Sequence, residues 1–553
     1  MPFPFSDRLT YALAALAIVA CMMFGARVPA TVVARVERVL AHRLTPVLAA
    51  LLSALAIFWV AGSLDPVAVY HDERAYVLQA ELFAHGRWTG LAAPIPEFFT
   101  QLHVFVTPYL AAKYPLGNSL LLAPGAFVGA PALMVVLLGA LAGGLVFALA
   151  RRVANGLVAV VTWLVWLAPG PVLGIRAGYM SQVSTAPLWL VTWYAVLRYR
   201  DDNEPHRARW LMLAVAAVAV CAIVRPLTAV ALAVPCAVVL IRRVHARHEW
   251  NLAAQSLAVG IAILCLLPLQ NVKTTGDWRT SPLVTYTRTV TPFDFPTFGY
   301  DETRPIAPLP TDLNRARQSL IFPRVLHTPQ NLIWILPTRV AAIARVTWSD
   351  WRLPLVLFAV LGLFRLPVAA RVAAWSALLL YVVHVMHAHN PWWTLFYHEM
   401  VPVLAFATAL GFAKVVVWFR ARSRRTGESG LAPTADGAVR GSLILAAAAM
   451  LIITPFEVAR TRERLDVLKR PQRLFRDAVA SIPEAKAIVF VRYPASASGH
   501  LSLVGNPPDY GTARAWLVYD RGPENAKLSA LAPDRVAYYY DAGYGTLERG
   551  AAH

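Results

Sequence analysis

The stretch PALMVVLLGALAGGLVFALA, residues 131–150, contains no charged side chain and ends directly before Arg151 and Arg152. A helix of about 20 apolar residues is long enough to cross the hydrocarbon core of a bilayer. Comparable apolar runs recur along the 553-residue chain, in which 58% of residues are hydrophobic and only 15% are charged. Soluble domains carry roughly 25% charged residues. We therefore predict an all-α polytopic membrane protein.

The apolar runs predict about twelve membrane spans. The first, Leu9 to Gly25, lacks a small-residue cleavage signature, so we expect a retained helix rather than a removed signal peptide. The spans are expected near 9–25, 46–64, 131–150, 157–174, 185–197, 210–224, 228–241, 251–270, 353–366, 371–388, 399–418 and 441–457.

The net charge of +20 is concentrated in short loops between the spans. Because basic loops stay on the cytoplasmic side, alternating spans place the long segments 65–130, 175–184, 271–352 and 389–398 outside the cytoplasm. Loop-by-loop clustering is typical of orientation signals and anionic membrane lipids, and it excludes a nucleic-acid face. The basic segments are Arg27 to Arg43, Arg151–Arg152, Arg198 to Arg209, Arg242 to Arg247, Arg365 to Arg371 and Arg420 to Arg440.

The last part of the chain differs in character. Residues 1–457 hold the expected spans, whereas 458–553 are more charged and contain a helix-like stretch from Arg473 to Ile482. Strand-like runs follow at 487–491, 516–520 and 537–541, separated by turn signals. We expect a small exterior α/β accessory domain, joined to a membrane part that has no internal repeat and a low-complexity cytoplasmic linker at 426–439.

Cysteine and histidine patterns indicate neither a disulfide framework nor a metal site. The four cysteines all lie inside expected spans. A histidine cluster near Trp392 and Trp393 is more typical of an interfacial aromatic belt than of metal ligands. The cysteines are Cys21, Cys221, Cys236 and Cys265, and the histidines are His384, His387, His389 and His398.

The first exterior loop, 65–130, carries the most informative polar residues. It opens with His71-Asp72-Glu73-Arg74-Ala75-Tyr76 and closes with Lys113-Tyr114-Pro115-Leu116-Gly117. A carboxylate at the membrane face can take a proton from an acceptor, and a nearby lysine can neutralise a leaving phosphate. Acidic residues are also favoured at a helix N-terminus by the helix dipole alone, so the pair by itself leaves both readings open.

The segment from His71 to Gly125 resembles the first exterior loop of the GT-C superfamily of membrane glycosyltransferases. The branch that it resembles includes protein O-mannosyltransferases and lipid A aminoarabinose transferases. The resemblance rests on Asp72-Glu73, Tyr76, Gln79-Ala80, Gly86 and Lys113-Tyr114-Pro115. Leu116 stands where relatives usually have a second proline.

Weaker matches extend the resemblance over most of residues 46–460. Relatives usually carry Arg-Tyr before the last of the matched prolines, so Leu395 or Phe396 at that place puts one phosphate contact in doubt. Arg225 is also typical of a residue that snorkels at a helix end. The matches are Tyr179-Met180-Ser181-Gln182, Arg225-Pro226, Asn271 with Thr275-Gly276 and Pro282 to Tyr286, and Tyr397-His398-Glu399 with Pro402.

The resemblance implies an inverting sugar transfer from a polyprenyl-phosphate-linked donor at the exterior face of the cell inner membrane. Asp72 would be the catalytic base and Glu73 would support it, while Lys113, Tyr114, Arg225 and His398 would bind the donor phosphate. The acceptor stays open between glycan, lipid and protein; no cofactor is assigned, and a divalent cation is left open. Residues expected to line the substrate are Tyr76, Tyr179, Gln182, Asn271, Tyr286, Tyr397 and Glu399.

Two other classes of function remain. A transporter or flippase for lipid-linked sugars also needs many spans, but its ionisable residues should lie mid-span. A scaffold protein would leave Asp72 without chemical work. The collection of ionisable residues at the exterior boundary favours the transferase.

Overall fold

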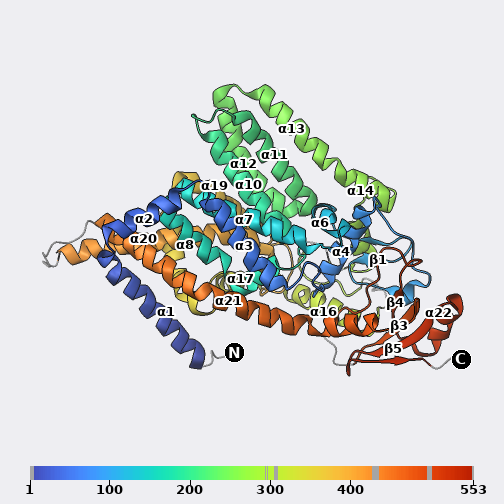
Figure 1. Ribbon diagram of the computed structural model, residues 1–553. Helices are drawn as coiled ribbons and strands as arrows, with labels where there is room; N and C mark the ends of the chain where they lie inside the picture. Colours follow the sequence, from blue (N-terminus) through green and yellow to red (C-terminus); the bar gives the residue numbers. More distant parts are fainter. Residues whose placement is uncertain are drawn as a thin grey trace.

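The computed structural model describes residues 5–292, 294, 297–303, 309–425, 435–494 and 501–550. Most of the linker expected at 426–439 lies outside these residues. The chain is mostly helical, with a small sheet near its C-terminus (Figure 1).

The first half of the chain contributes helices α1 to α14. They are α1 (Phe5–Phe24), α2 (Ala30–Ala41), α3 (Thr45–Ala61), α4 (His71–Ala84), α5 (Pro96–Phe99), α6 (Gly117–Phe127), α7 (Ala132–Val153), α8 (Gly156–Leu167), α9 (Gly170–Arg176), α10 (Gln182–Arg200), α11 (Arg207–Val224), α12 (Pro226–Arg247), α13 (Trp250–Leu264) and α14 (Leu266–Thr275).

The second half continues with helices α15 to α22 and short 3-10 turns. They are α15 (Pro282–Thr289), α16 (Thr311–Leu326), α17 (Leu332–Thr347), η2 (Asp350–Leu355), α18 (Val356–Leu363), η3 (Val368–Ala370), α19 (Arg371–Val383), η4 (Thr394–Met400), α20 (Val401–Arg425), α21 (Ala435–Ala480), η5 (Gly522–Glu524) and α22 (Asn525–Leu531); a further turn, η1 (Gly25–Arg27), follows α1.

Seven helices in the described part of the chain are long and apolar enough to cross a membrane. Three bent pairs, α2 with α3, α8 with α9, and α17 with α18, raise the number to as many as ten if each pair is one span. The chain is therefore a multi-pass membrane protein, but the expectation of about twelve spans is not confirmed.

Two of the expected spans, 185–197 and 371–388, match neither the seven long apolar helices nor the bent pairs. They coincide with α10 and α19. The apolar helix that contains α19 is short, at Val368–Val383. In α10 the side chains of Ser184, Thr185 and Thr192 are polar and fully buried, so they face protein rather than lipid. A helix that packs its polar groups inward does not need the uniform hydropathy of a lipid-facing span.

The basic loops meet at one end of the helical bundle. Arg151 donates to the backbone carbonyls at the end of α2, Arg152 pairs with Asp201 at 2.6 Å, and Arg440 pairs with Glu37 at 3.1 Å. In Figure 1, α2 lies at the left and the sheet lies at the right. These basic segments therefore share one end of the bundle.

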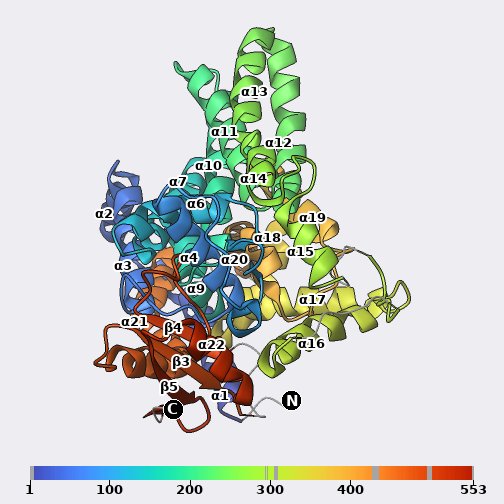
Figure 2. The ribbon, with the colours of Figure 1, turned by 90° about the vertical axis from the view of Figure 1, so that its right-hand side faces the viewer.

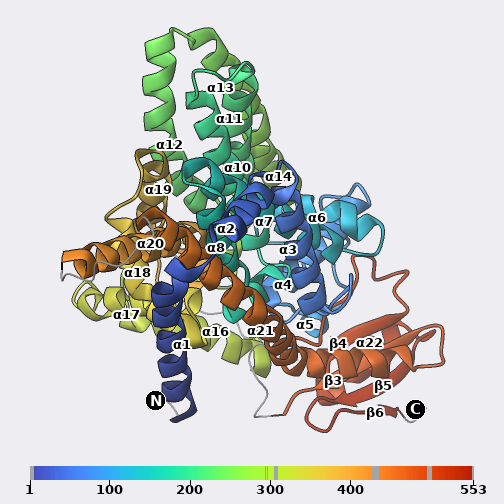
Figure 3. The same cartoon turned by 60° about the vertical axis from the view of Figure 1, so that its left-hand side comes forward.

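The C-terminal sheet has the strand order β4-β3-β5-β6. Strands β3 (Ala487–Arg492), β4 (Ala515–Tyr519) and β5 (Val536–Asp541) are parallel, and β6 (Thr546–Arg549) runs antiparallel to β5. The three expected strands are thus confirmed. Helix α21 runs without a break through residue 457, where the membrane part was expected to end, and carries the chain from the bundle to the sheet (Figure 3).

The loop 65–130 lies against this sheet. It contains α4, α5, α6 and a two-stranded ribbon of β1 (Val104–Phe105) and β2 (Ala111–Ala112). Its apolar residues share one buried cluster with the C-terminal domain, in which Phe98 contacts Phe490 and Phe99 contacts Trp516. The loop and the C-terminal domain therefore lie on the same side of the bundle, as Figure 2 shows for α4 and β4.

Candidate functional site

Helix α4 presents the residues of the acidic motif to different surroundings. Asp72 and Tyr76 are four residues apart and so share one face of the helix. Glu73 is one residue further on, and consecutive helical side chains do not face the same way. Asp72 and Glu73 both lie in the first turn, where the helix dipole favours negative charge.

Asp72 is held by the residues that close the same loop. The Tyr114 hydroxyl donates to Asp72 Oδ1, and His103 Nε2 lies 3.8 Å from Oδ2. The Asp72 side chain remains 36% exposed. Burial alone would raise the pKa of Asp72, but His103, the Tyr114 hydroxyl and Lys113 together place it below its usual value. Asp72 is therefore an ionised, partly accessible carboxylate.

Lys113 is buried beside this carboxylate. Its ammonium lies 5.0 Å from the ring centre of Tyr286 and 5.3 Å from that of Tyr114, within the range of cation–π attraction. Tyr114 in turn stacks on Tyr76 with ring centres 4.6 Å apart. Burial lowers the pKa of Lys113, an effect that Asp294 and Asp72 oppose. Four predicted site residues, Asp72, Tyr76, Lys113 and Tyr114, thus come together.

The sequence interpretation missed two residues of this cluster. Asp294 Oδ2 lies 3.9 Å from Lys113 Nζ, and Asp294 Oδ1 accepts a hydrogen bond of 2.8 Å from the guanidinium of Arg324. Arg324 is only 1% exposed. Both residues come from the expected exterior segment 271–352, and no local pattern distinguishes them from its other charged residues.

His103 and Gln270 were also missed. The backbone N–H of His103 donates to the Tyr286 hydroxyl at 2.8 Å, which joins the predicted residue Tyr286 to the first loop. Burial and the neighbouring Lys113 lower the pKa of His103 to about 3, so its ring is neutral at neutral pH. The Gln270 amide bonds the carbonyl of Tyr114 and the N–H of Leu116, and so braces the Lys113-Tyr114-Pro115-Leu116 turn.

Glu73 has a different environment from Asp72. Its carboxylate accepts backbone N–H bonds from Val69 at 2.8 Å, Tyr70 at 3.3 Å and Tyr179 at 3.0 Å. Burial raises its pKa, although these bonds and Lys469 oppose the rise. Both carboxylate oxygens are occupied by the backbone, so Glu73 ties the start of α4 to the turn at Tyr179.

Arg225, His398 and Glu399 form a second buried group. Arg225 Nη1 lies 3.5 Å from Glu399 Oε1, which also accepts from the Thr185 hydroxyl. His398 Nε2 accepts from Arg176 Nε at 3.4 Å, and Arg176 stacks on Trp166 at 3.8 Å. Burial raises the pKa of Tyr76, and the positive charge of Arg225 opposes this rise, so Arg225 lies within electrostatic range of the Tyr76 hydroxyl.

The other predicted lining residues serve mainly local contacts. Tyr179 donates to the carbonyl of Pro66 at 3.1 Å, Gln182 to that of Leu395 at 3.0 Å and Asn271 to that of Trp278 at 2.8 Å. Tyr397 contacts His389 Nε2 through its hydroxyl at 3.2 Å. These contacts hold the loops around the site. Of the predicted lining residues outside the first loop, Tyr286 has its ring within cation–π range of Lys113.

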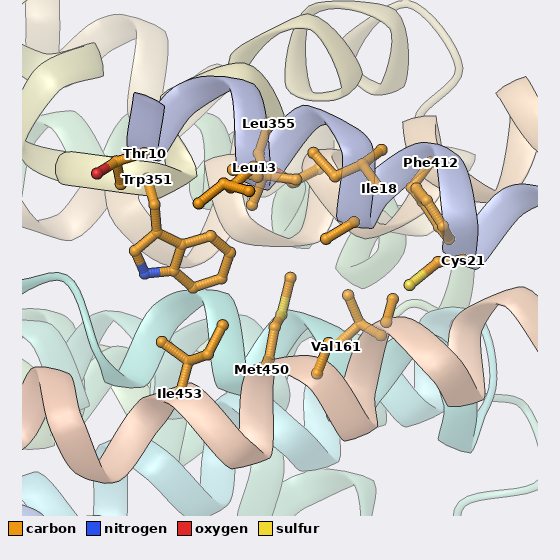
Figure 4. Close-up of a pocket in the computed structure, with 15 residues that line it drawn as sticks. Thr10, Leu13, Ile18, Cys21, Val161, Trp351, Leu355, Phe412, Met450 and Ile453 are labelled. Carbon is orange, nitrogen blue, oxygen red and sulfur yellow. The ribbon is translucent and has the colours of Figure 1, made fainter. Parts of the chain in front are cut away.

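Within the described ranges, no group of three or more His, Cys, Asp or Glu side chains is arranged to hold a metal ion. An apolar cavity of about 380 Å³ lies elsewhere, between α1, α8, η2, α20 and α21 (Figure 4). Its lining includes Leu13, Cys21, Trp351 and Met450, and none of the predicted site residues. The polar cluster around Asp72 is therefore the candidate site.

No protein-family model matches this chain, and no curated protein matches it significantly. Among solved structures, the chain is similar to ArnT from Cupriavidus metallidurans, both bound to undecaprenyl phosphate and in the apo state. Both comparisons give 15% identity and a TM-score of 0.48. The first covers 91% of this chain and 94% of that chain, and the second covers 90% and 93%.

Proposed function

We propose that this protein is a membrane glycosyltransferase that uses a polyprenyl-phosphate-linked sugar at the exterior face of the cytoplasmic membrane. One observation carries the proposal: the partly exposed Asp72 carboxylate is held by the Tyr114 hydroxyl next to the buried ammonium of Lys113. An ionised carboxylate beside a cation suits a reaction that removes a proton and releases an anion.

In the proposed reaction, an acceptor hydroxyl or amine gives its proton to Asp72 as the acceptor atom bonds to the anomeric carbon. The bond from that carbon to the phosphate oxygen breaks, and its electron pair leaves with the polyprenyl phosphate. Attack from the side opposite the leaving group inverts the anomeric carbon. Lys113 stabilises the negative charge that develops on the phosphate, and Asp72 Oδ1 stays fixed by Tyr114 while Oδ2 takes the proton.

We assign the remaining predicted residues by their contacts. Arg225 is proposed as a second phosphate cation, and Glu399 orients it. His398 is proposed to act through Arg176 rather than directly on phosphate, because its Nε2 accepts from that guanidinium. Glu73 is proposed as a positioning residue for α4, because three backbone N–H groups occupy its carboxylate. The stacked rings of Tyr76 and Tyr114 are proposed to line the site.

The test is Asp72→Asn, which keeps the size of the side chain and removes the base. Transfer should fall by roughly two to four orders of magnitude. The readout is the surface glycan and lipid profile of a deletion strain that expresses the variant at native level. Asp65→Asn is the matched control, because Asp65 belongs to the same loop but pairs with Arg476 at 3.8 Å on an exposed surface. Normal glycan with the Asp72 variant would contradict the proposal.

The second candidate is a transporter or flippase for a lipid-linked sugar. The observation in its favour is the buried group of Arg176, Arg225, His398 and Glu399 among the membrane helices. A transporter would lose function with Glu399→Gln while tolerating Asp72→Asn. The transferase predicts the opposite order of severity.

A further inference from the structure

We infer that Lys113 and Arg324 form an anion-binding site, that the Asp294 carboxylate pairs with both cations there, and that the donor phosphate competes with Asp294 for them. The identity of the anion rests on the proposed function. The geometry of the site does not, because it follows from the contacts of three described side chains.

The Asp294 carboxylate bridges two cations with its two oxygens. Oδ1 accepts from Arg324 at 2.8 Å, and Oδ2 lies 3.9 Å from Lys113 Nζ. The two oxygens thus divide between a guanidinium and an ammonium. Two non-bridging oxygens of a phosphodiester can make the same division, and both cation types are common phosphate ligands.

Burial of both cations favours an anion at this position. Lys113 is 3% exposed and Arg324 is 1% exposed, whereas the Asp294 side chain is 26% exposed. Buried charges are stable only when they are paired. The cations are thus fixed in the protein interior, and their anion is the member of the cluster that solvent can reach.

The position of this site matches the proposed chemistry. Lys113 lies close enough to Asp72 to lower the pKa of that carboxyl, so an anion at Lys113 is also near the proposed base. A phosphate in the place of the Asp294 carboxylate would be bound by the same lysine whose charge acts on Asp72. Asp294 in turn would favour release of the leaving lipid phosphate, because it can pair with the vacated cations.

With competition of this kind, the apparent affinity of a ligand is its intrinsic affinity multiplied by the fraction of protein molecules in which the site is free. Asp294→Asn removes the negative charge and keeps the size of the side chain. Binding of a lipid phosphate should therefore tighten, by about 5- to 50-fold. Turnover should fall at the same time, because product release becomes slower.

The experiment measures binding of farnesyl phosphate and of farnesol to the full-length protein in detergent. The expected result is that Asp294→Asn tightens farnesyl phosphate binding and leaves farnesol binding unchanged. Asp301→Asn is the matched control, because Asp301 lies in the same segment and accepts from Thr303. The Asp301→Asn variant should bind farnesyl phosphate and farnesol as tightly as the wild type does.

Arg324→Lys is the second variant, since it retains a cation and loses the planar guanidinium that donates to Asp294 Oδ1; it should weaken farnesyl phosphate binding at least 3-fold. Unchanged or weaker farnesyl phosphate binding in Asp294→Asn overturns the inference, and so does equal tightening for farnesol. If Asp294→Asn tightens phosphate binding while Asp72→Asn retains full transfer, the competition stands and the proposed role of Asp72 falls.

Discussion

Two neighbouring carboxylates of α4 have opposite chemical characters. Asp72 keeps one carboxylate oxygen accessible, and its pKa is lowered. Glu73 is buried, its pKa is raised, and its carboxylate oxygens accept hydrogen bonds from backbone N–H groups. A general base must be accessible to the substrate, whereas a carboxylate that accepts backbone hydrogen bonds must be held in place. The two carboxylates therefore separate into a proposed base, Asp72, and an anchor, Glu73, within one helical turn.

The pKa directions predict the acid side of the activity profile. Because the pKa of Asp72 lies below its ordinary value of about 3.9, this proposed base stays deprotonated throughout the neutral and mildly acidic range. His103, with a pKa of about 3, remains neutral over the same range. Transfer by the purified protein should thus show no acid limb between about pH 5 and 8. A limb centred near pH 6.5 would indicate a histidine base instead.

The anchor role of Glu73 depends on Gly178. A Cβ atom at that position would lie 2.1 Å from Glu73 Oε1. The carboxylate cannot move aside without losing its backbone bonds, so Gly178→Ala should lower stability by about 1–3 kcal/mol. Thermal inactivation of the detergent-purified protein measures the effect. Gly174→Ala should be close to neutral, because the nearest atom to its Cβ lies 3.8 Å away.

At the scale of elements, α4 is packed between two parts of the molecule. Tyr76 and Ala80 belong to the core of the helical bundle, whereas Ala75 and Leu78 belong to the cluster shared with the C-terminal sheet. The position of Asp72 is thus set from both sides. The C-terminal domain therefore contributes to the packing that fixes α4.

Arg74 is the side chain that should transmit this packing. It lies against Gly505, and its charge interacts with Tyr493 and Tyr519 of the C-terminal domain. Arg74→Ala should lower kcat about 10- to 100-fold, because Asp72 two residues away loses its alignment, while KM for the donor changes little.

Arg74→Lys should recover part of the rate. Arg87→Ala is the control, since Arg87 contacts Asp509 on an exposed surface at 4.0 Å and should contribute little. Equal loss in both variants, or a loss confined to KM, would argue against the alignment role. Steady-state kinetics with saturating acceptor distinguish these results.

At the scale of the whole molecule, the basic loops gather at the end of the bundle where α2 lies (Figure 1). The loop that carries the candidate site packs against the C-terminal sheet, away from that end (Figures 1 and 2). We predict that the basic end is cytoplasmic and that the site and sheet face the exterior. Tyr544, at 87% exposure, and the exposed Arg38 are suited to a labelling test.

In spheroplasts, Tyr544→Cys should react with a membrane-impermeant maleimide, whereas Arg38→Cys should react only after permeabilisation. The wild type is the control for the four native cysteines. The reverse pattern would place the candidate site in the cytoplasm and remove the basis for an exterior donor.

The membrane class, most of the helices and the strands of the C-terminal domain were determined by the sequence itself. Apolar runs, basic loops and alternation act over neighbouring residues, and a local pattern is enough to specify a local structure. The Asp72 to Lys113 motif is likewise contained in one loop.

Only the tertiary structure decided which other residues join that loop. Lys113, Asp294 and Arg324 are far apart in sequence and meet because the spans bring separate loops to one end. Glu73 became an anchor because the Tyr179 turn packs onto it, and α21 continued past residue 457 to the sheet. Contacts between distant segments depend on how the helices pack, which no local run of residues specifies.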